Sequence, residues 1–306
     1  MDRLDATELA FFKRELEAVD TRIFEEKLPD LKARQLIPTI SDLAAGDRSY
    51  TYRMFKKIGK AKYAGAGGSN DAPRADVAGN EFTTNLKPVI ASYGYNIWEL
   101  QAAAKAGRPL DAMRGVAARR AMEQLVDESW AWGDAEQGLK GLLTLSSIND
   151  FAGSGVWGTL ATADPDKVVA DIMGICSYTN EQTKGVFGRF RVLLPIKLYN
   201  LAAQLRMGDG SDQTALKFAL ANCPYLSDVQ PWFRCSAAAD AEGSPLSKDL
   251  MFAYPVDEMV VGGLVQEIDF LAPQEKGYEF EIPGHAATGG VVCRYPIALT
   301  KCDDMT

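Results

Sequence analysis

Tyr50-Thr51-Tyr52-Arg53-Met54-Phe55 is a short run with the composition of a β-strand. A return run from Glu81 to Tyr93 has the same character, and the segment Gly59–Asn80 between them contains five glycines. The pattern predicts a long hairpin over residues 47–93. A two-stranded ribbon is marginally stable alone in water, and ordering each residue costs about 1–2 kcal/mol of backbone entropy. This hairpin therefore needs another surface to pack on, and a neighbouring subunit is the natural candidate.

The outgoing strand of the hairpin carries a basic run, formed by Lys56, Lys57, Lys60 and Lys62. The simplest interpretation is an exposed strand edge that its lysines protect against the addition of further strands. The alternative is contact with an acidic face of a neighbour, which gains weight only if the hairpin lies between subunits. The stretch Gly65–Gly68 lacks the third glycine of a nucleotide-binding loop and precedes no expected helix, so we interpret it as the hairpin tip.

The first 35 residues are typical of an arm that lies on another surface. Asp5 and Glu8 have the spacing of a capping box at the start of a helix. Apolar residues follow at helical spacing, and they are Leu9, Phe12, Leu16, Val19 and Ile23. Charged residues cover the remaining face, so we predict an amphipathic N-terminal helix.

The rest of the chain mixes helices and strands without steady alternation. Helices are expected over 97–105, 111–132, from Asp164-Pro165 onward, 196–205 and 214–222. Strands are expected over 189–194, 229–234, 250–254, 260–270, 278–282 and 291–300, with a turn at 133–138. Because neither a repeated strand–helix unit nor an internal repeat is present, the predicted class is α+β.

The composition is that of an ordinary folded protein. The chain has 306 residues, of which 47% are hydrophobic and 24% charged, and its net charge is −8. Its apolar runs are too short for a membrane span, and the polar start Met1–Asp5 does not resemble a secretory signal. The net acidity argues against a nucleic-acid binder held mainly by phosphate contacts.

Residues suited to catalysis or metal binding are scarce. The five cysteines are scattered and form no C-x-x-C pair, which favours reduced, buried thiols over disulfides or a zinc site. His285 is the only histidine, and its setting between two apolar runs predicts a structural residue in a loop. Asp209-Gly210-Ser211-Asp212 has a simple explanation as a turn. We expect no catalytic, cofactor-binding or metal-binding residues.

Stretches beside the long helix and near the C-terminus carry a family resemblance. Before the helix stand Tyr95–Ala103 and Gly107–Asp111, and after it Trp132–Asp134 and Gly138–Leu142. Near the C-terminus stand Phe270–Phe280 and Gly284–Val292. In this order they resemble the major capsid proteins of tailed phages with the Hong Kong 97-type fold, which encapsulin shells share. The C-terminal stretches are similar to a phage and prophage branch of that family.

The resemblance implies a division of the chain into parts. Residues 1–45 would be an N-terminal arm, 46–94 an extended loop, 95–189 a peripheral domain with a long spine helix, 190–262 an axial domain, and 263–306 the C-terminal strands of the peripheral domain. The implied function is structural and not enzymatic: pentamers and hexamers of an icosahedral head around double-stranded DNA, assembled in the host cytoplasm and found in the virion. Implied partners are further copies of the chain, then scaffolding, portal and decoration proteins; DNA is touched only weakly and membranes are not involved.

Candidate intersubunit contacts lie on the arm and the hairpin. They are Phe12, Leu16, Tyr50, Tyr52, Lys56, Lys57, Lys60, Lys62 and Phe82. Four tryptophans are further candidates, because this residue type often dominates interface energy, namely Trp98, Trp130, Trp157 and Trp232. The type member of the family crosslinks a hairpin lysine to an asparagine of a neighbour. Since nothing in this sequence identifies such a partner, we expect non-covalent assembly.

Two other functions stay open at this point. An encapsulin-type nanocompartment shell protein would share the fold and hold a cargo enzyme in place of a genome. The layout of arm and hairpin, with the C-terminal stretches, favours the phage protein. A monomeric enzyme using Asp and Glu chemistry would be a globule around a defined pocket, which the unsupported hairpin argues against.

Overall fold

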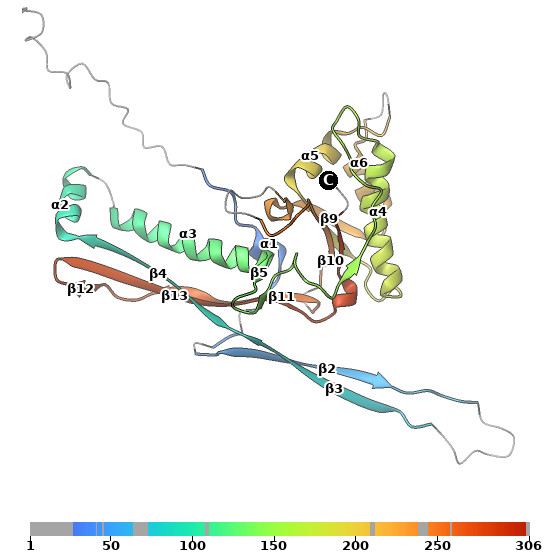
Figure 1. Cartoon of the computed structure of the whole chain (residues 1–306), viewed down its shortest axis with the longest axis horizontal. Helices are drawn as coiled ribbons and strands as arrows, with labels where there is room; N and C mark the ends of the chain where they lie inside the picture. The colour runs from blue at the N-terminus through green and yellow to red at the C-terminus, as the bar shows by residue number, and fades with distance from the viewer. Residues whose placement is uncertain are drawn as a thin grey trace, which may run out of the picture. The chain divides into compact units, whose positions relative to one another are not determined.

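The computed structural model describes residues 27–40, 42–44, 46–63, 73–107, 110–208, 212–237, 244–257 and 259–303. Internal contacts divide the chain into two units, Met1–Asp30 and Leu31–Thr306. The fold given below is that of the second unit, drawn as a ribbon in Figure 1. The predicted N-terminal helix, with Phe12 and Leu16, lies outside the described residues.

The central strands of one sheet in the second unit are buried on both faces. The strands of this sheet lie in the order β7-β14-β10-β8-β9, with bounds Asn149–Asp150, Thr300–Cys302, Met251–Pro255, Phe190–Leu194 and Leu226–Pro231. Successive side chains of a strand point to opposite faces, so Val192 and Leu194 belong to one core and Leu193 to another. All three are fully buried. The unbroken apolar run of β8 follows from this two-sided burial.

Three helices cover one face of this sheet. α4 (Pro165–Gln182), α5 (Ile196–Gln204) and α6 (Ala215–Asn222) share one core with β8 and β10. α4 begins where the sequence predicts, because the Asp164 side chain accepts a hydrogen bond from the Asp166 N–H and proline occupies the first turn. α4 therefore packs with elements of the 190–262 segment.

A second sheet carries the long helix. β1 (Thr39–Ile40), β11 (Val261–Phe270), β13 (Glu279–Cys293) and β12 (Gln274–Lys276) lie in that order, and β4 (Lys87–Asn96) also pairs with β13. The long helix is α3 (Leu110–Ala131), which packs on β4 and β13 and confirms the helix expected over 111–132.

Shorter elements flank α3. α2 (Ile97–Lys105) precedes it and is capped by the Asn96 side chain, which accepts a hydrogen bond from the Trp98 N–H. β5 (Gly133–Asp134) and β6 (Leu139–Lys140) follow it as a tight hairpin, which confirms the predicted turn. In the described part of the chain, no helix is both long and apolar enough to span a membrane.

A buried ion pair joins α1 (Ala33–Leu36), α3 and the 3-10 helix η1 (Phe233–Cys235). Arg234 Nε lies 3.1 Å from Asp127 Oδ2, and both side chains are at most 3% exposed. Asp127 Oδ1 also accepts a hydrogen bond from the Ala33 N–H at 2.8 Å. Burial raises the pKa of Asp127, while its hydrogen bonds to Ala33 and Arg234 oppose that shift. The pair ties the start of the second unit to α3 and η1.

A glycine is required where α3 meets β11. The Trp130 side chain is fully buried, and its Nε1 donates a hydrogen bond to Thr288 Oγ1 at 3.3 Å. A Cβ at Gly263 would lie 2.5 Å from the Trp130 ring. The indole can approach the sheet only because position 263 has no side chain.

We expect Gly263→Ala to lower the free energy of unfolding by about 1–3 kcal/mol, the usual cost of overpacking a core. Gly188→Ala is the matched control, because a Cβ there meets nothing within 4 Å. The control should stay within about 0.5 kcal/mol of the wild type. Chemical denaturation measures both variants, and equal stabilities would contradict the proposed steric role.

The return run predicted from Glu81 to Tyr93 is divided between two sheets. β2 (Ser49–Ile58) pairs with β3 (Asp76–Asn85), whereas β4 pairs with β13. The division falls at Leu86, whose side chain is buried and whose N–H donates to the Arg48 carbonyl oxygen. The predicted hairpin is therefore confirmed for the paired strands 49–58 and 76–85 and wrong beyond Leu86.

The predicted loop around His285 is part of β13, which is continuous over 15 residues. The strand is continuous because it pairs with both β4 and β11, and His285 is an exposed residue within it. Gly290, with φ of +67°, accommodates an irregularity opposite Leu264 without ending the strand. The strands expected at 229–234 and 291–300 are each interrupted by a 3-10 helix, η1 in the first and η2 (Pro296–Ala298) in the second.

Candidate intersubunit surface

The base of the β2–β3 hairpin is anchored to its own chain. Tyr50, Tyr52 and Met54 are half-buried, and the residues between them are exposed. The Tyr52 ring stacks on Phe82 across the two strands, with the ring centroids 5.3 Å apart. Arg294 donates a hydrogen bond to Tyr50 Oη at 3.0 Å, and its guanidinium lies 5.8 Å from the centre of the Tyr52 ring. Burial raises the pKa of Tyr52.

We expect Arg294→Ala to loosen this base and speed amide hydrogen exchange in β2 about tenfold, because a hydrogen bond and a cation–π contact are lost together. Arg119→Ala is the control, since the ion-pair partner of Arg119, Glu123, lies on the same helix α3. Exchange in β2 should be unchanged in the control. Equal exchange rates in both variants would show that Arg294 does not hold the hairpin.

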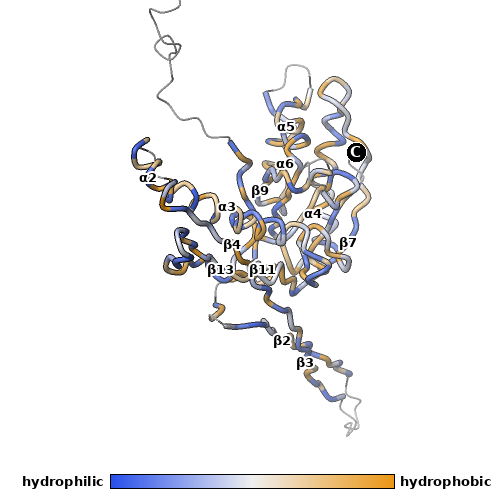
Figure 2. Tube along the Cα trace, turned by 60° about the vertical axis from the view of Figure 1, so that its left-hand side comes forward, coloured by the Kyte–Doolittle hydropathy of each residue, from blue (hydrophilic) through white to orange (hydrophobic). Residues whose placement is uncertain are grey.

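The distal part of the hairpin exposes large apolar side chains. Phe55 is 72% exposed, Ile58 52% and Val77 57%. Phe55 and Ile58 are an odd number of residues apart on one strand, so they lie on opposite faces of the ribbon. The hydropathy colouring of Figure 2 shows hydrophobic positions continuing into this part of β2 and β3. Both faces of the distal hairpin therefore present apolar surface, as an interaction site does.

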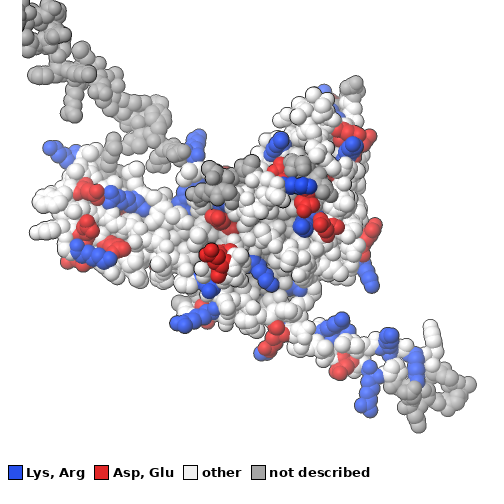
Figure 3. All heavy atoms as spheres, in the orientation of Figure 1, with Lys and Arg blue, Asp and Glu red and all other residues white. Residues whose placement is uncertain are grey.

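The distal hairpin is also basic. Lys56, Lys57, Lys60 and Lys62 are exposed, and Figure 3 shows Lys and Arg side chains gathered at this end. Residues 49–85 contain six basic and three acidic side chains, although the whole chain has a net charge of −8. The remainder of the chain is therefore acidic. Hairpin and remainder are complementary in charge, which favours contact between the hairpin of one copy and the body of another.

A groove of about 750 Å³ lies between the hairpin base and the body. The hairpin lines it with Tyr52 and Phe82, and the body with Trp132, Leu145 and Ile148. Apolar surface thus continues from the hairpin onto the body.

The structure brings some of the predicted contact residues together and separates others. Tyr50, Tyr52 and Phe82 meet at the hairpin base, and the four lysines follow along the outgoing strand and beyond it. Their part in contacts between subunits stays a prediction. The apolar distal residues are missing from the predicted set. The sequence does contain a signal for these residues. Apolar side chains no longer alternate with polar ones after Met54, so that Phe55 and Ile58 fall on opposite faces of the strand.

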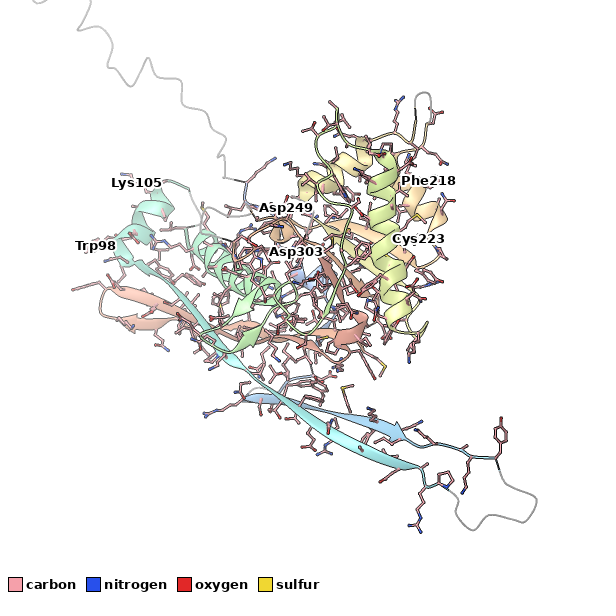
Figure 4. The ribbon with its side chains drawn as sticks, turned by 45° about the vertical axis from the view of Figure 1, so that its right-hand side comes forward. Trp98, Lys105, Phe218, Cys223, Asp249 and Asp303 are labelled. Atoms are coloured by element: carbon pink, nitrogen blue, oxygen red, sulfur yellow. The ribbon has the colours of Figure 1, made fainter. Side chains whose placement is uncertain are left out.

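Three of the four tryptophans proposed as interface residues are core residues. Trp130, Trp157 and Trp232 are at most 3% exposed, so the interface prediction is wrong for them. They are buried because each packs inside one of the two large cores of its own chain. Trp98 on α2, labelled in Figure 4, is 66% exposed.

Comparison with known proteins relates this chain to a protein family. A family model described as major capsid protein matches residues 59–305. A search of curated protein sequences gives no match. The chain is similar to the capsid protein of Myoviridae phage XM1, with a TM-score of 0.81, 16% identity and coverage of 96% of this chain and 99% of that one.

Two further solved structures are similar. A chain of Mycobacterium phage Adephagia has a TM-score of 0.61 and 13% identity, with coverage of 95% of this chain and 92% of that one. A virus-like particle from Pyrococcus furiosus has a TM-score of 0.53 and 12% identity, with coverage of 88% and 90%. These likenesses confirm the predicted α+β fold. Since the family model matches most of the residues, the chain belongs to the major capsid protein family and has the Hong Kong 97-type fold of tailed-phage capsids.

Proposed function

We propose that this chain assembles with copies of itself into the pentamers and hexamers of a closed icosahedral phage head that encloses double-stranded DNA. The observation that carries the proposal is the distal hairpin, which is basic and exposes apolar side chains on both faces. Contact of this hairpin with a different surface on the next subunit is heterologous. Such contacts produce rings and lattices, whereas a two-fold contact ends at a dimer. Assembly, and not catalysis, is then the chemistry of the protein.

Each part of the chain has a role in this proposal. Residues 1–45 form the arm, 46–86 the extended loop, 87–164 and 263–306 the peripheral domain, and 165–262 the axial domain. α4 shares its core with β8, α5 and α6, so we count this helix with the axial domain. Scaffolding, portal and decoration proteins are the further partners proposed. Assembly takes place in the host cytoplasm, and the finished shell is part of the virion.

The direct experiment is the size of the purified chain, measured by light scattering with negative-stain images of the largest fraction. Closed shells, or rings of five or six subunits, are the expected result. A monomer that never assembles, even when concentrated or given a scaffold, would contradict the proposal. On a denaturing gel the shells should run as single subunits, because assembly is expected to be non-covalent.

Assembled shells should bind double-stranded DNA only weakly at low salt. The reason is the net charge of −8, which leaves little phosphate affinity after the hairpin is occupied by a neighbour. The measurement is cosedimentation of shells with linear DNA at about 50 mM salt. Tight binding under this condition would contradict the expectation that DNA is touched only weakly.

The encapsulin-type shell is the less favoured reading. The matching family model is that of a major capsid protein, and the XM1 phage capsid is similar to this chain with a TM-score of 0.81. Copurification separates the two functions, because a phage head yields DNA-packaging partners and a nanocompartment yields a cargo enzyme. A single stoichiometric enzyme inside the shells would favour the nanocompartment.

A further inference from the structure

The turn between β12 and β13 exposes an aromatic side chain. Lys276 pairs with Glu279 across the two strands, so Gly277 and Tyr278 form a two-residue turn. Gly277 adopts a φ of +72°, a conformation that favours glycine and is common in such turns. Tyr278 is 70% exposed. Because tyrosine is among the residue types that most often dominate interface energy, its exposure here indicates a contact surface.

Acidic side chains surround Tyr278 on this turn. Glu275 and Glu279 are exposed on either side of it. Glu281 forms an ion pair with Lys276. Residues 274–281 contain three acidic side chains and one basic one, so the turn presents an aromatic ring among an excess of negative charge.

The groove at the hairpin base has the complementary character. Aromatic walls face it from the hairpin and from the body, formed by Tyr52, Phe82 and Trp132. Its charged residues are Lys140, Arg294 and Glu128, so cations are in excess although the net charge of the chain is −8. Its volume of about 750 Å³ is that of a site for a drug-sized molecule, so an aromatic side chain with its flanking residues fits. The groove is therefore suited to an acidic segment with an aromatic anchor.

The turn and the groove of one copy are too far apart to meet. Tyr278 directly precedes β13, whereas Cys293, the last residue of β13, lines the groove. At the usual rise of a strand, the 15 residues of β13 hold the two sites about 45 Å apart. Figure 1 shows β12 near α2, at the far end of β13. Only a second copy can bring its turn to this groove, and such a contact is heterologous.

We propose that the groove of each copy receives the β12–β13 turn of a second copy, with the Tyr278 ring between the aromatic walls and the flanking carboxylates beside Lys140 and Arg294. The inference rests on the proposed assembly and goes beyond it by naming a second contact, separate from that of the distal hairpin. One wall of the groove belongs to the hairpin and the other to the body, so an occupant contacts both. Docking of the turn therefore also holds the hairpin of the receiving copy in place.

The test is photo-crosslinking from position 278 in assembled shells. Tyr278 is replaced by p-benzoylphenylalanine, which on irradiation inserts into nearby C–H bonds and reacts readily with methionine. Met54 lines the groove. In shells assembled from light and heavy nitrogen-labelled chains, we expect linked peptides of mixed label that join residue 278 to Met54 or to residues 144–148. Links between two copies of the turn, links to a surface outside the groove, or no links at all in intact shells would overturn the proposal.

An exchange of charges tests the same contact without a photoreactive residue. Glu275→Lys with Glu279→Lys should lower the yield of shells about tenfold, and Lys140→Glu should do the same, because each change makes turn and groove repel. The chain with all three changes carries opposite charges at the contact again and should recover the shells. All three side chains are exposed, so the melting temperature of the subunit should not change.

Lys140→Arg is the matched control, because it keeps the charge, and it should assemble like the wild type. Equal yields of shells from all these variants, or no recovery in the combined variant, would overturn the proposal. Shells that form but lack the links from position 278 contradict only this inference. A wild-type chain that never assembles contradicts the proposed function, and this inference with it.

Discussion

Asp127→Ala should lower the free energy of unfolding of the subunit by about 3–5 kcal/mol, the loss typical of breaking a buried ion pair by removing one partner. Arg234 would keep its charge in a position that is 2% exposed, stacked 4.6 Å from the centre of the Trp132 ring. The Ala33 N–H would lose its acceptor as well. Urea denaturation of the unassembled subunit measures the change.

Two variants serve as controls for Asp127. Glu123→Ala removes a carboxylate from the same helix, but its partner Arg119 is 60% exposed, so the loss should not exceed about 1 kcal/mol. The double variant Asp127→Ala/Arg234→Met removes both charges and should recover part of the loss, since the remaining cost is mainly an unpaired buried cation. If Asp127→Ala alone lowers the free energy of unfolding by less than about 1 kcal/mol, the structural role of this pair is contradicted.

Reversal of charge on the hairpin should abolish shell formation. A variant with Lys56, Lys57, Lys60 and Lys62 all changed to Glu makes the distal hairpin acidic, so that it repels the acidic remainder of a neighbouring copy. The lysines are exposed, so the folded subunit should keep its melting temperature. Light scattering should then find the chain as single subunits or small oligomers. We expect the amount of shells to fall at least tenfold, which corresponds to a loss of about 1.4 kcal/mol of contact energy.

The matched control changes the same four lysines to arginine. This variant preserves the charge and removes the amines, and it should form shells like the wild type. The control also tests the expectation of non-covalent assembly, because a lysine crosslink would be lost in it. Normal shells from the glutamate variant would show that the basic run is only a solvated edge.

Local signals in the sequence predict most helices correctly. Asp164 and Pro165 place the start of α4, because capping depends on residues within one turn, and α2 begins at Ile97 as predicted. The central strands β8 and β10 are recognisable as well, since the apolar run of each reflects burial on both faces.

Strand partners are predicted less well, because pairing depends on residues far away in sequence. The segments β3 and β4 have similar composition, yet one pairs with β2 and the other with β13. The glycines near His285 suggest a loop, but β13 continues through them because β4 and β11 hold it on both sides. The interface prediction is wrong for three tryptophans for a related reason, since residue type does not distinguish a core position from an interface position.

The central claim is that the hairpin of one copy contacts another copy in the shell. Intersubunit crosslinking tests this claim most directly. Shells assembled from equal amounts of light and heavy nitrogen-labelled chains are treated with a carbodiimide, which joins lysine amines to carboxylates. Crosslinks from Lys56, Lys57, Lys60 or Lys62 to acidic residues of the body should appear with mixed light and heavy labels. Hairpin crosslinks that carry a single label only, in intact shells, would show that the hairpin lies on its own subunit and would contradict the account.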